Sequence, residues 1–109
     1  MTVNELSSMA GMRAVALPDG EREINGVYIG DLLSWVMGRA KADNAWITIM
    51  SNINIIAVAA LADVALIILA ENVEVDAAVR ATASEKGINI YSSSKTSYCL
   101  AAELSKILS

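Results

Sequence analysis

The alternation of apolar and polar residues is clearest in residues 45–70, which read AWITIMSNINIIAVAALADVALIILA. The two outer apolar runs, residues 45–50 and 64–70, have the composition and the length of strands. The apolar run between them, residues 55–62, is rich in Ala and is typical of a helix. The three runs predict a strand–helix–strand unit whose strands are buried on both faces of a sheet.

A membrane-spanning helix is the alternative for this stretch, because about 20 apolar residues suffice to cross a bilayer. Ser51, Asn52 and Asn54 interrupt the first half of the stretch, and Asp63 interrupts the second half. No cluster of Lys and Arg flanks it to orient a helix in a bilayer. We therefore expect no contact with a membrane.

Turn and cap residues divide the rest of the chain into elements. Thr2 and Glu5 form a capping box, which predicts that a short helix follows. Asp76 and Gly87 are residues that commonly begin and end a helix. The predicted strands outside the central unit are residues 12–17, 24–29 and 88–91. Four helices are predicted outside it: a short one after Thr2, one over residues 32–37, one from Asp76 to near Lys86, and a last one that ends at about Leu108.

The predicted elements follow the order α-β-β-α-β-α-β-α-β-α in a single domain, residues 1–109. From residue 45 onward the strands alternate with helices, which requires right-handed crossovers and a parallel sheet. We therefore predict an α/β fold with three layers and a mostly parallel sheet of about five strands.

Composition narrows the classes of function. Hydrophobic residues make up 55% of the chain and charged residues only 18%, below the usual share of about a quarter. So much apolar surface on a small domain favours a homodimer or a protein partner. The net charge of −4 and the lack of a Lys/Arg cluster disfavour nucleic acid as a partner, because phosphate backbones need several cationic contacts.

The chain also lacks residues on which many kinds of site depend. It has no His, which is the usual general base near neutral pH and the commonest metal ligand. Its one cysteine, Cys99, has no such base to activate it and is expected to be inert. We predict no catalytic residues, no metal site and no cofactor. Residues 1–8 lack the features of a secretory signal, which indicates a cytoplasmic protein.

Polar residues follow the predicted parallel strands, at the edge where open α/β sheets bind ligands. Residues 92–96 are the most informative, because they combine hydroxyls, a Lys and the N–H groups at a helix start, which together suit an anion. The alternative is ordinary helix capping by Ser and Thr. The candidate ligand-binding residues at these strand ends are Ser51, Asn52, Glu71, Asn72, Ser92, Ser93, Ser94, Lys95 and Thr96.

Asp31 is a further candidate, because it stands between a predicted strand and the predicted helix 32–37. It either contacts a ligand or caps the helix. That helix is apolar almost all round, as is typical of a helix that is deeply buried or touches another chain. We predict that Leu32, Trp35 and Val36 contact a second copy of the chain.

Several phrases of the chain, from TVNELSSMAGMRAV through NIIAVAALADVALIILAENV to EKGINIYSSSKTSY, form a recognisable pattern. Its most specific part is GVYIGDLLSWVMGRA followed by AWIT. In these phrases the chain resembles the DRTGG domain family. The five-residue signature for which the family is named is absent. The family is similar to the N-terminal domain of HPr kinase/phosphorylase and, more distantly, to the N-terminal domains of Mur ligases.

The resemblance implies an α/β domain that regulates or assembles other domains without supplying catalytic residues, and that forms a homodimer. We therefore expect a non-catalytic regulatory and dimerisation module that senses a small anionic ligand such as a nucleotide. The alternative is a structural scaffold that binds protein and no ligand. An enzyme ranks third, because nothing in the sequence pairs a nucleophile with a base.

Overall fold

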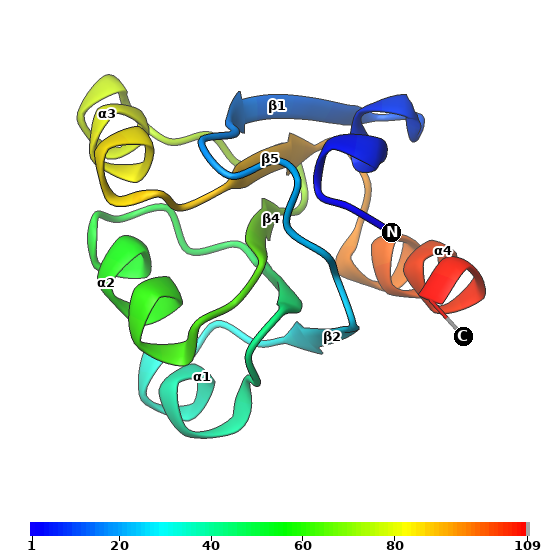
Figure 1. Cartoon of the computed structure of the whole chain (residues 1–109), viewed down its shortest axis with the longest axis horizontal. Coiled ribbons are helices and arrows are strands. Elements are labelled where there is room, and N and C mark those ends of the chain that lie inside the picture. The colour runs from blue at the N-terminus through cyan, green and yellow to red at the C-terminus, as the bar shows by residue number, and fades with distance from the viewer. Residues whose placement is uncertain (109) are drawn as a thin grey trace.

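The computed structural model describes residues 1–108 and has the predicted three-layer α/β fold (Figure 1). The five strands form one sheet in the order β1-β5-β4-β3-β2. β1 runs antiparallel to β5, and the other neighbours are parallel. The elements are the 3-10 helix η1 (Asn4–Ser8), β1 (Met12–Ala16), β2 (Gly26–Ile29), α1 (Leu33–Arg39), β3 (Asn44–Thr48), α2 (Asn54–Ala62), β4 (Leu66–Leu69), α3 (Ala77–Lys86), β5 (Ile90–Ser93) and α4 (Ser97–Leu108).

The central strands β3 and β4 supply both cores of the domain. All residues of β4 are buried, as a strand covered on both faces requires. Their side chains alternate between the two faces of the sheet, with Trp46 and Ile67 in one core and Ile47 and Ile68 in the other. The prediction that this apolar stretch forms two doubly covered strands is therefore confirmed.

Different helices cover the two faces of the sheet. Helices α1, α2 and α3 lie on the face of Trp46, where Val36 and Val79 are buried. Helix α4 and η1 lie on the opposite face, where Leu100 and Leu6 are buried (Figure 1). Because β2, β3, β4 and β5 are parallel, their carboxyl ends share one edge of the sheet, between the two helical layers.

Tyr91 fixes η1 against the sheet. Its ring is fully buried, and its hydroxyl donates a hydrogen bond to the backbone oxygen of Val3 at 2.9 Å. Burial raises the pKa of Tyr91, because the charged phenolate would be poorly solvated there. The residue therefore stabilises the fold only in its neutral, donating form.

The predicted caps are present. The Thr2 N–H donates to the Glu5 carboxylate at 2.9 Å, and the Glu5 N–H donates to the Thr2 hydroxyl at 3.4 Å. The Thr2 hydroxyl also donates to the Glu5 carboxylate, at 3.1 Å, and the two bonds that this carboxylate accepts, that from the Thr2 N–H foremost, lower the pKa of Glu5. The Asp76 carboxylate accepts from the N–H of Val79 at the start of α3, and Gly87 ends the helix with a left-handed φ of 76°.

Two helices differ from their predicted form. The first is a 3-10 helix instead of an α-helix, and short helices of that length commonly adopt the tighter form. Helix α1 continues through Gly38 and ends at Arg39, whereas the predicted helix covered residues 32–37. Packing of the buried Val36 on the core outweighs the cost of about 1 kcal/mol for a glycine inside a helix.

The last strand also differs from the prediction. Ser92 and Ser93 close β5 and are buried, whereas the predicted strand ended at residue 91 and placed them after it. Their hydroxyls are tolerated because each has a partner. Ser92 donates to the backbone oxygen of Val73 at 2.7 Å, and Ser93 accepts from the N–H of Lys95 at 3.1 Å.

Over residues 1–108, no helix combines the length and the apolar character that crossing a bilayer requires.

Candidate functional site

The loops that leave β4 and β5 meet at the carboxyl edge of the sheet. The N–H of Glu71 donates to the backbone oxygen of Lys95 at 2.9 Å, and the N–H of Asn72 donates to that of Ser93 at 2.7 Å. Ser51 and Asn52 lie in the exposed loop after β3, and no hydrogen bond within residues 1–108 joins their side chains to these two loops. The structure thus brings together the candidates from two of the three predicted segments.

Glu71 and Asn72 form a strained turn at this edge. Both have left-handed backbone angles, with φ of 59° and 62°. Asn adopts this region more readily than most residues, and Glu does not. Backbone of this kind persists where its surroundings hold it, which the two hydrogen bonds to the β5 loop do here.

Arg13 completes this part of the edge. It lies on β1 directly opposite Ser92. Its guanidinium donates to the Asn72 side-chain oxygen at 3.0 Å and to the Ser92 hydroxyl at 3.0 Å, and it approaches the Glu74 carboxylate at 3.4 Å. Sequence reasoning missed Arg13. The available signal was a single charged residue inside a predicted strand of otherwise apolar character, MRAVAL.

A small polar hollow opens beside Arg13, between β1, β5 and the segment that leads into α3. Its volume is about 160 Å³. We call it the Arg13 hollow. Its lining residues are Arg13, Ala14, Val15, Glu74, Val75, Arg80 and Ser92.

Lys95 forms an ion pair within the fold. Its ammonium group donates to both carboxylate oxygens of Glu103 on α4, at 2.7 and 2.8 Å. Its side chain crosses Gly11, where an added Cβ would lie 3.3 Å from the Lys95 Cε. The neighbouring Thr96 hydroxyl accepts from the N–H of Cys99, which is a helix-capping bond. These two candidates therefore hold α4 to the loop after β5, and a ligand would have to compete with Glu103 for Lys95.

Asp31 clamps the ends of β2 and β3. Its carboxylate accepts from the Thr48 hydroxyl at 2.8 Å and from the N–H of Ile49 at 3.0 Å. It does not cap α1, whose N-cap is Leu32 and carries no side-chain bond. The clamp occupies one carboxylate oxygen of Asp31, and the side chain remains exposed to solvent.

The candidate dimer-contact residues divide into two groups. Leu32 and Trp35 are 59% and 52% exposed, and the Arg39 guanidinium lies 3.6 Å from the centre of a Trp35 ring. Val36 is fully buried in the core of its own chain. Val36 therefore has no surface to offer a second copy, and the candidate contact reduces to Leu32 and Trp35.

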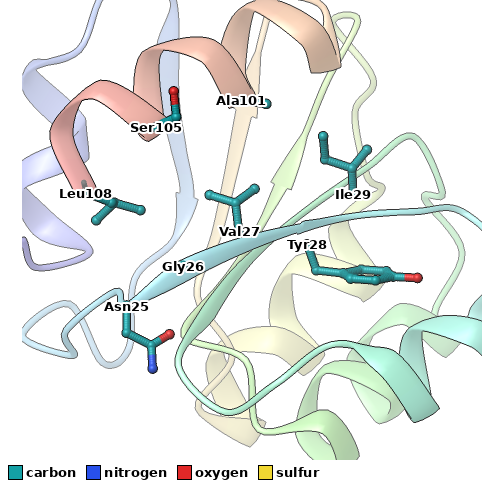
Figure 2. A pocket seen from close by; sticks show the side chains of 8 residues that line it. All are labelled: Asn25, Gly26, Val27, Tyr28, Ile29, Ala101, Ser105 and Leu108. Carbon is teal, nitrogen blue, oxygen red and sulfur yellow. The ribbon is translucent and has the colours of Figure 1, made fainter.

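A larger groove of about 540 Å³ lies between β2 and α4. Figure 2 shows Val27 and Ile29 pointing from β2 toward the helix, whereas Tyr28 points to the opposite face. Ala101 and Leu108 line the groove from the α4 side. No charged residue lines it, so the groove suits an apolar surface better than a charged ligand.

A cluster of three charges at the opposite edge of the sheet is structural. Arg22 pairs with Asp43 at 2.9 Å and with Asp63 at 2.8 Å, and both aspartates have left-handed φ. Burial alone would lower the pKa of Arg22, but hydrogen bonds with Asp63 and Asp43 outweigh it and raise the pKa overall. The cluster thus uses its charges to hold the turns before β3 and β4.

Within residues 1–108, no group of three or more His, Cys, Asp or Glu side chains is placed to hold a metal ion. Cys99 is an exposed free thiol.

Comparison with known proteins yields a likeness of fold. No protein-family model matches the chain, and no curated protein matches it in sequence. A solved structure of the CBS and DRTGG domains of the regulatory region of Clostridium perfringens pyrophosphatase, complexed with its activator diadenosine tetraphosphate, superposes with a TM-score of 0.67 at 15% identity. The match covers 93% of this chain and 44% of that chain, so this chain spans under half the length of its neighbour. The chain therefore has a DRTGG-like α/β fold, as its resemblance to that family predicted.

Proposed function

We propose that this chain is a non-catalytic regulatory domain that binds a small anionic ligand, such as a nucleotide, at the carboxyl edge of its sheet. The observation that carries the proposal is the meeting of the β4 and β5 loops with Arg13 at that edge, which places a cation and several polar groups where α/β sheets take their ligands. The regulatory region with the similar fold binds a nucleotide activator, which supports the same class of ligand.

Thermal unfolding in the presence of candidate ligands tests this proposal. The panel comprises adenine and guanine nucleotides, dinucleotides, acyl phosphates and inorganic phosphate. A ligand at a hundred times its dissociation constant adds about 2.7 kcal/mol of stability, which raises the melting temperature of a domain of this size by roughly 10 °C. Adenosine and guanosine serve as controls that lack the phosphate. If no compound shifts the transition, the scaffold alternative is favoured and the search turns to protein partners.

We further propose that the domain forms a homodimer through Leu32 and Trp35. Both side chains are large, apolar and more than half exposed, and a two-fold contact would place the same residues on both sides of the interface. We expect Trp35→Ala to lower the mass measured by light scattering at low micromolar concentration. Leu61→Ala is the matched control, because Leu61 is an apolar residue 74% exposed on α2, outside the proposed contact. An unchanged mass for Trp35→Ala would place the contact elsewhere.

A further inference from the structure

We propose that the Arg13 hollow binds the phosphate group of a phosphomonoester, held between Arg13 and Arg80. This inference rests on the proposed function and specifies its site and its ligand chemistry. The two arginines approach the hollow from β1 and from α3, and Ser92 lies in its wall.

Arg13 is oriented by the protein and still has donors to offer. Its three partners take both N–H groups of Nη2 and one of Nη1. A guanidinium carries five N–H groups, so the Nε–H and the second N–H of Nη1 have no partner within residues 1–108. Two of its partners, Asn72 and Ser92, are neutral and fix its position without cancelling its charge. A positioned guanidinium with spare donors is well suited to phosphate oxygens.

Arg80 supplies the second cation. It stands one residue after Val79, which packs in the core, and it is exposed at the rim of the hollow. Its side chain forms no ion pair or hydrogen bond with any other of residues 1–108. Glu74 is the single acidic residue among those that line the hollow. The hollow therefore carries a net positive charge in a chain whose total is −4, and this local reversal of sign favours an anion.

The size of the hollow restricts the ligand. A volume of 160 Å³ equals that of about five water molecules in the liquid, and pockets for whole drug-sized molecules begin at about 300 Å³. The space therefore suits a phosphate group, and the rest of the ligand must lie outside.

Among the residues that the structure describes, Glu74 is the one anionic partner of Arg13, and a phosphate in the hollow competes with it. Its contact with Arg13 is long, at 3.4 Å, and its side chain is 77% exposed, so the carboxylate can leave for solvent. A phosphate that replaces it exchanges one anionic partner of Arg13 for another. We therefore expect removal of the Glu74 charge to strengthen phosphate binding.

Calorimetric titration of the full chain with AMP, inorganic phosphate and adenosine tests the inference. We expect AMP and phosphate to bind and adenosine not to bind. Arg80→Gln should weaken AMP binding about tenfold, which corresponds to one charge-assisted contact. Glu74→Gln should tighten it severalfold. Lys106→Gln is the control, because it removes one positive charge from the last turn of α4, on the opposite face of the sheet.

The outcomes separate this inference from the proposed function. If a nucleotide binds equally well to wild type, Arg13→Gln and Arg80→Gln, the hollow is not its site, although a ligand-binding domain remains. Arg80 is exposed, so Arg80→Gln keeps the test decisive if Arg13→Gln fails to fold. Equal binding of adenosine and AMP would overturn the phosphate chemistry. If no compound of the panel binds by calorimetry or shifts the melting temperature, both proposals fail.

Discussion

Replacing Asp31 by alanine removes the clamp between β2 and β3. Two hydrogen bonds are lost, from the buried Thr48 hydroxyl and from the N–H of Ile49. Bonds to a charged acceptor contribute about 1.5–3 kcal/mol each, but Asp31 is exposed and water can partly replace it, so about 1 kcal/mol per bond is appropriate. We therefore expect Asp31→Ala to lower the free energy of unfolding by about 2 kcal/mol and the melting temperature by about 8 °C.

Scanning calorimetry of the wild type, Asp31→Ala and Asp31→Asn measures this effect. The asparagine variant keeps an oxygen acceptor and should lose about half as much stability. A melting temperature for Asp31→Ala within about 2 °C of the wild type would refute the reasoning. The same variants also test Asp31 as a ligand residue. If Asp31→Asn loses no more stability than expected but no longer binds AMP, the carboxylate contacts the ligand in addition to the strands.

Three further predictions concern stability. Because the pKa of Tyr91 is raised, its contribution to the free energy of unfolding is fully present below the unfolded pKa of about 10 and is lost as the pH rises through the folded pKa. Urea unfolding from pH 8 to 11.5 should show this loss of stability in the wild type and not in Tyr91→Phe. Asn89→Ala removes three buried or partly buried bonds to backbone groups, each 2.9 Å, and should cost roughly 3 kcal/mol by the same assay. Gly38 lies inside a helix with open space around it, so Gly38→Ala should stabilise the fold by about 0.5–1 kcal/mol. Gly87 has a φ of 76°, so Gly87→Ala should destabilise the fold by about 1 kcal/mol. Stability changes of the same sign in the two variants would contradict the argument.

The elements of this fold could be predicted because their signals are local. The capping box at Thr2 and the cap residues Asp76 and Gly87 mark helix ends through bonds within a few residues. The apolar runs that became β3 and β4 reflect burial on both faces. The observed boundaries of elements differ from the predicted ones by a residue or two where a tertiary contact outweighs a local preference, as in α1.

The site could be predicted only in part, because its contacts join distant residues. Sequence position alone shows that Ser92 and Lys95 follow a strand. It does not show that the Ser92 hydroxyl turns inward to Arg13, or that Glu103 takes the Lys95 ammonium group. Both pairings depend on register and on the placement of α4 against the sheet. Lys95, the cation that the sequence favoured for a ligand, is therefore paired with Glu103 within the fold. Arg13, the cation that the sequence did not indicate, lies beside the hollow.

The pairing of β1 with β5 has a consequence for synthesis of the protein. The two strands are separated by about 80 residues in the sequence, and bringing the ends of such a segment together costs about 4 kcal/mol of chain entropy. On the ribosome, β2, β3 and β4 can associate while β1 still lacks its partner strand, and β1 stays open to chaperones and proteases until β5 emerges. The Arg13 hollow is assembled by that last pairing, so the ligand that we propose can bind only after β5 has emerged and joined the sheet.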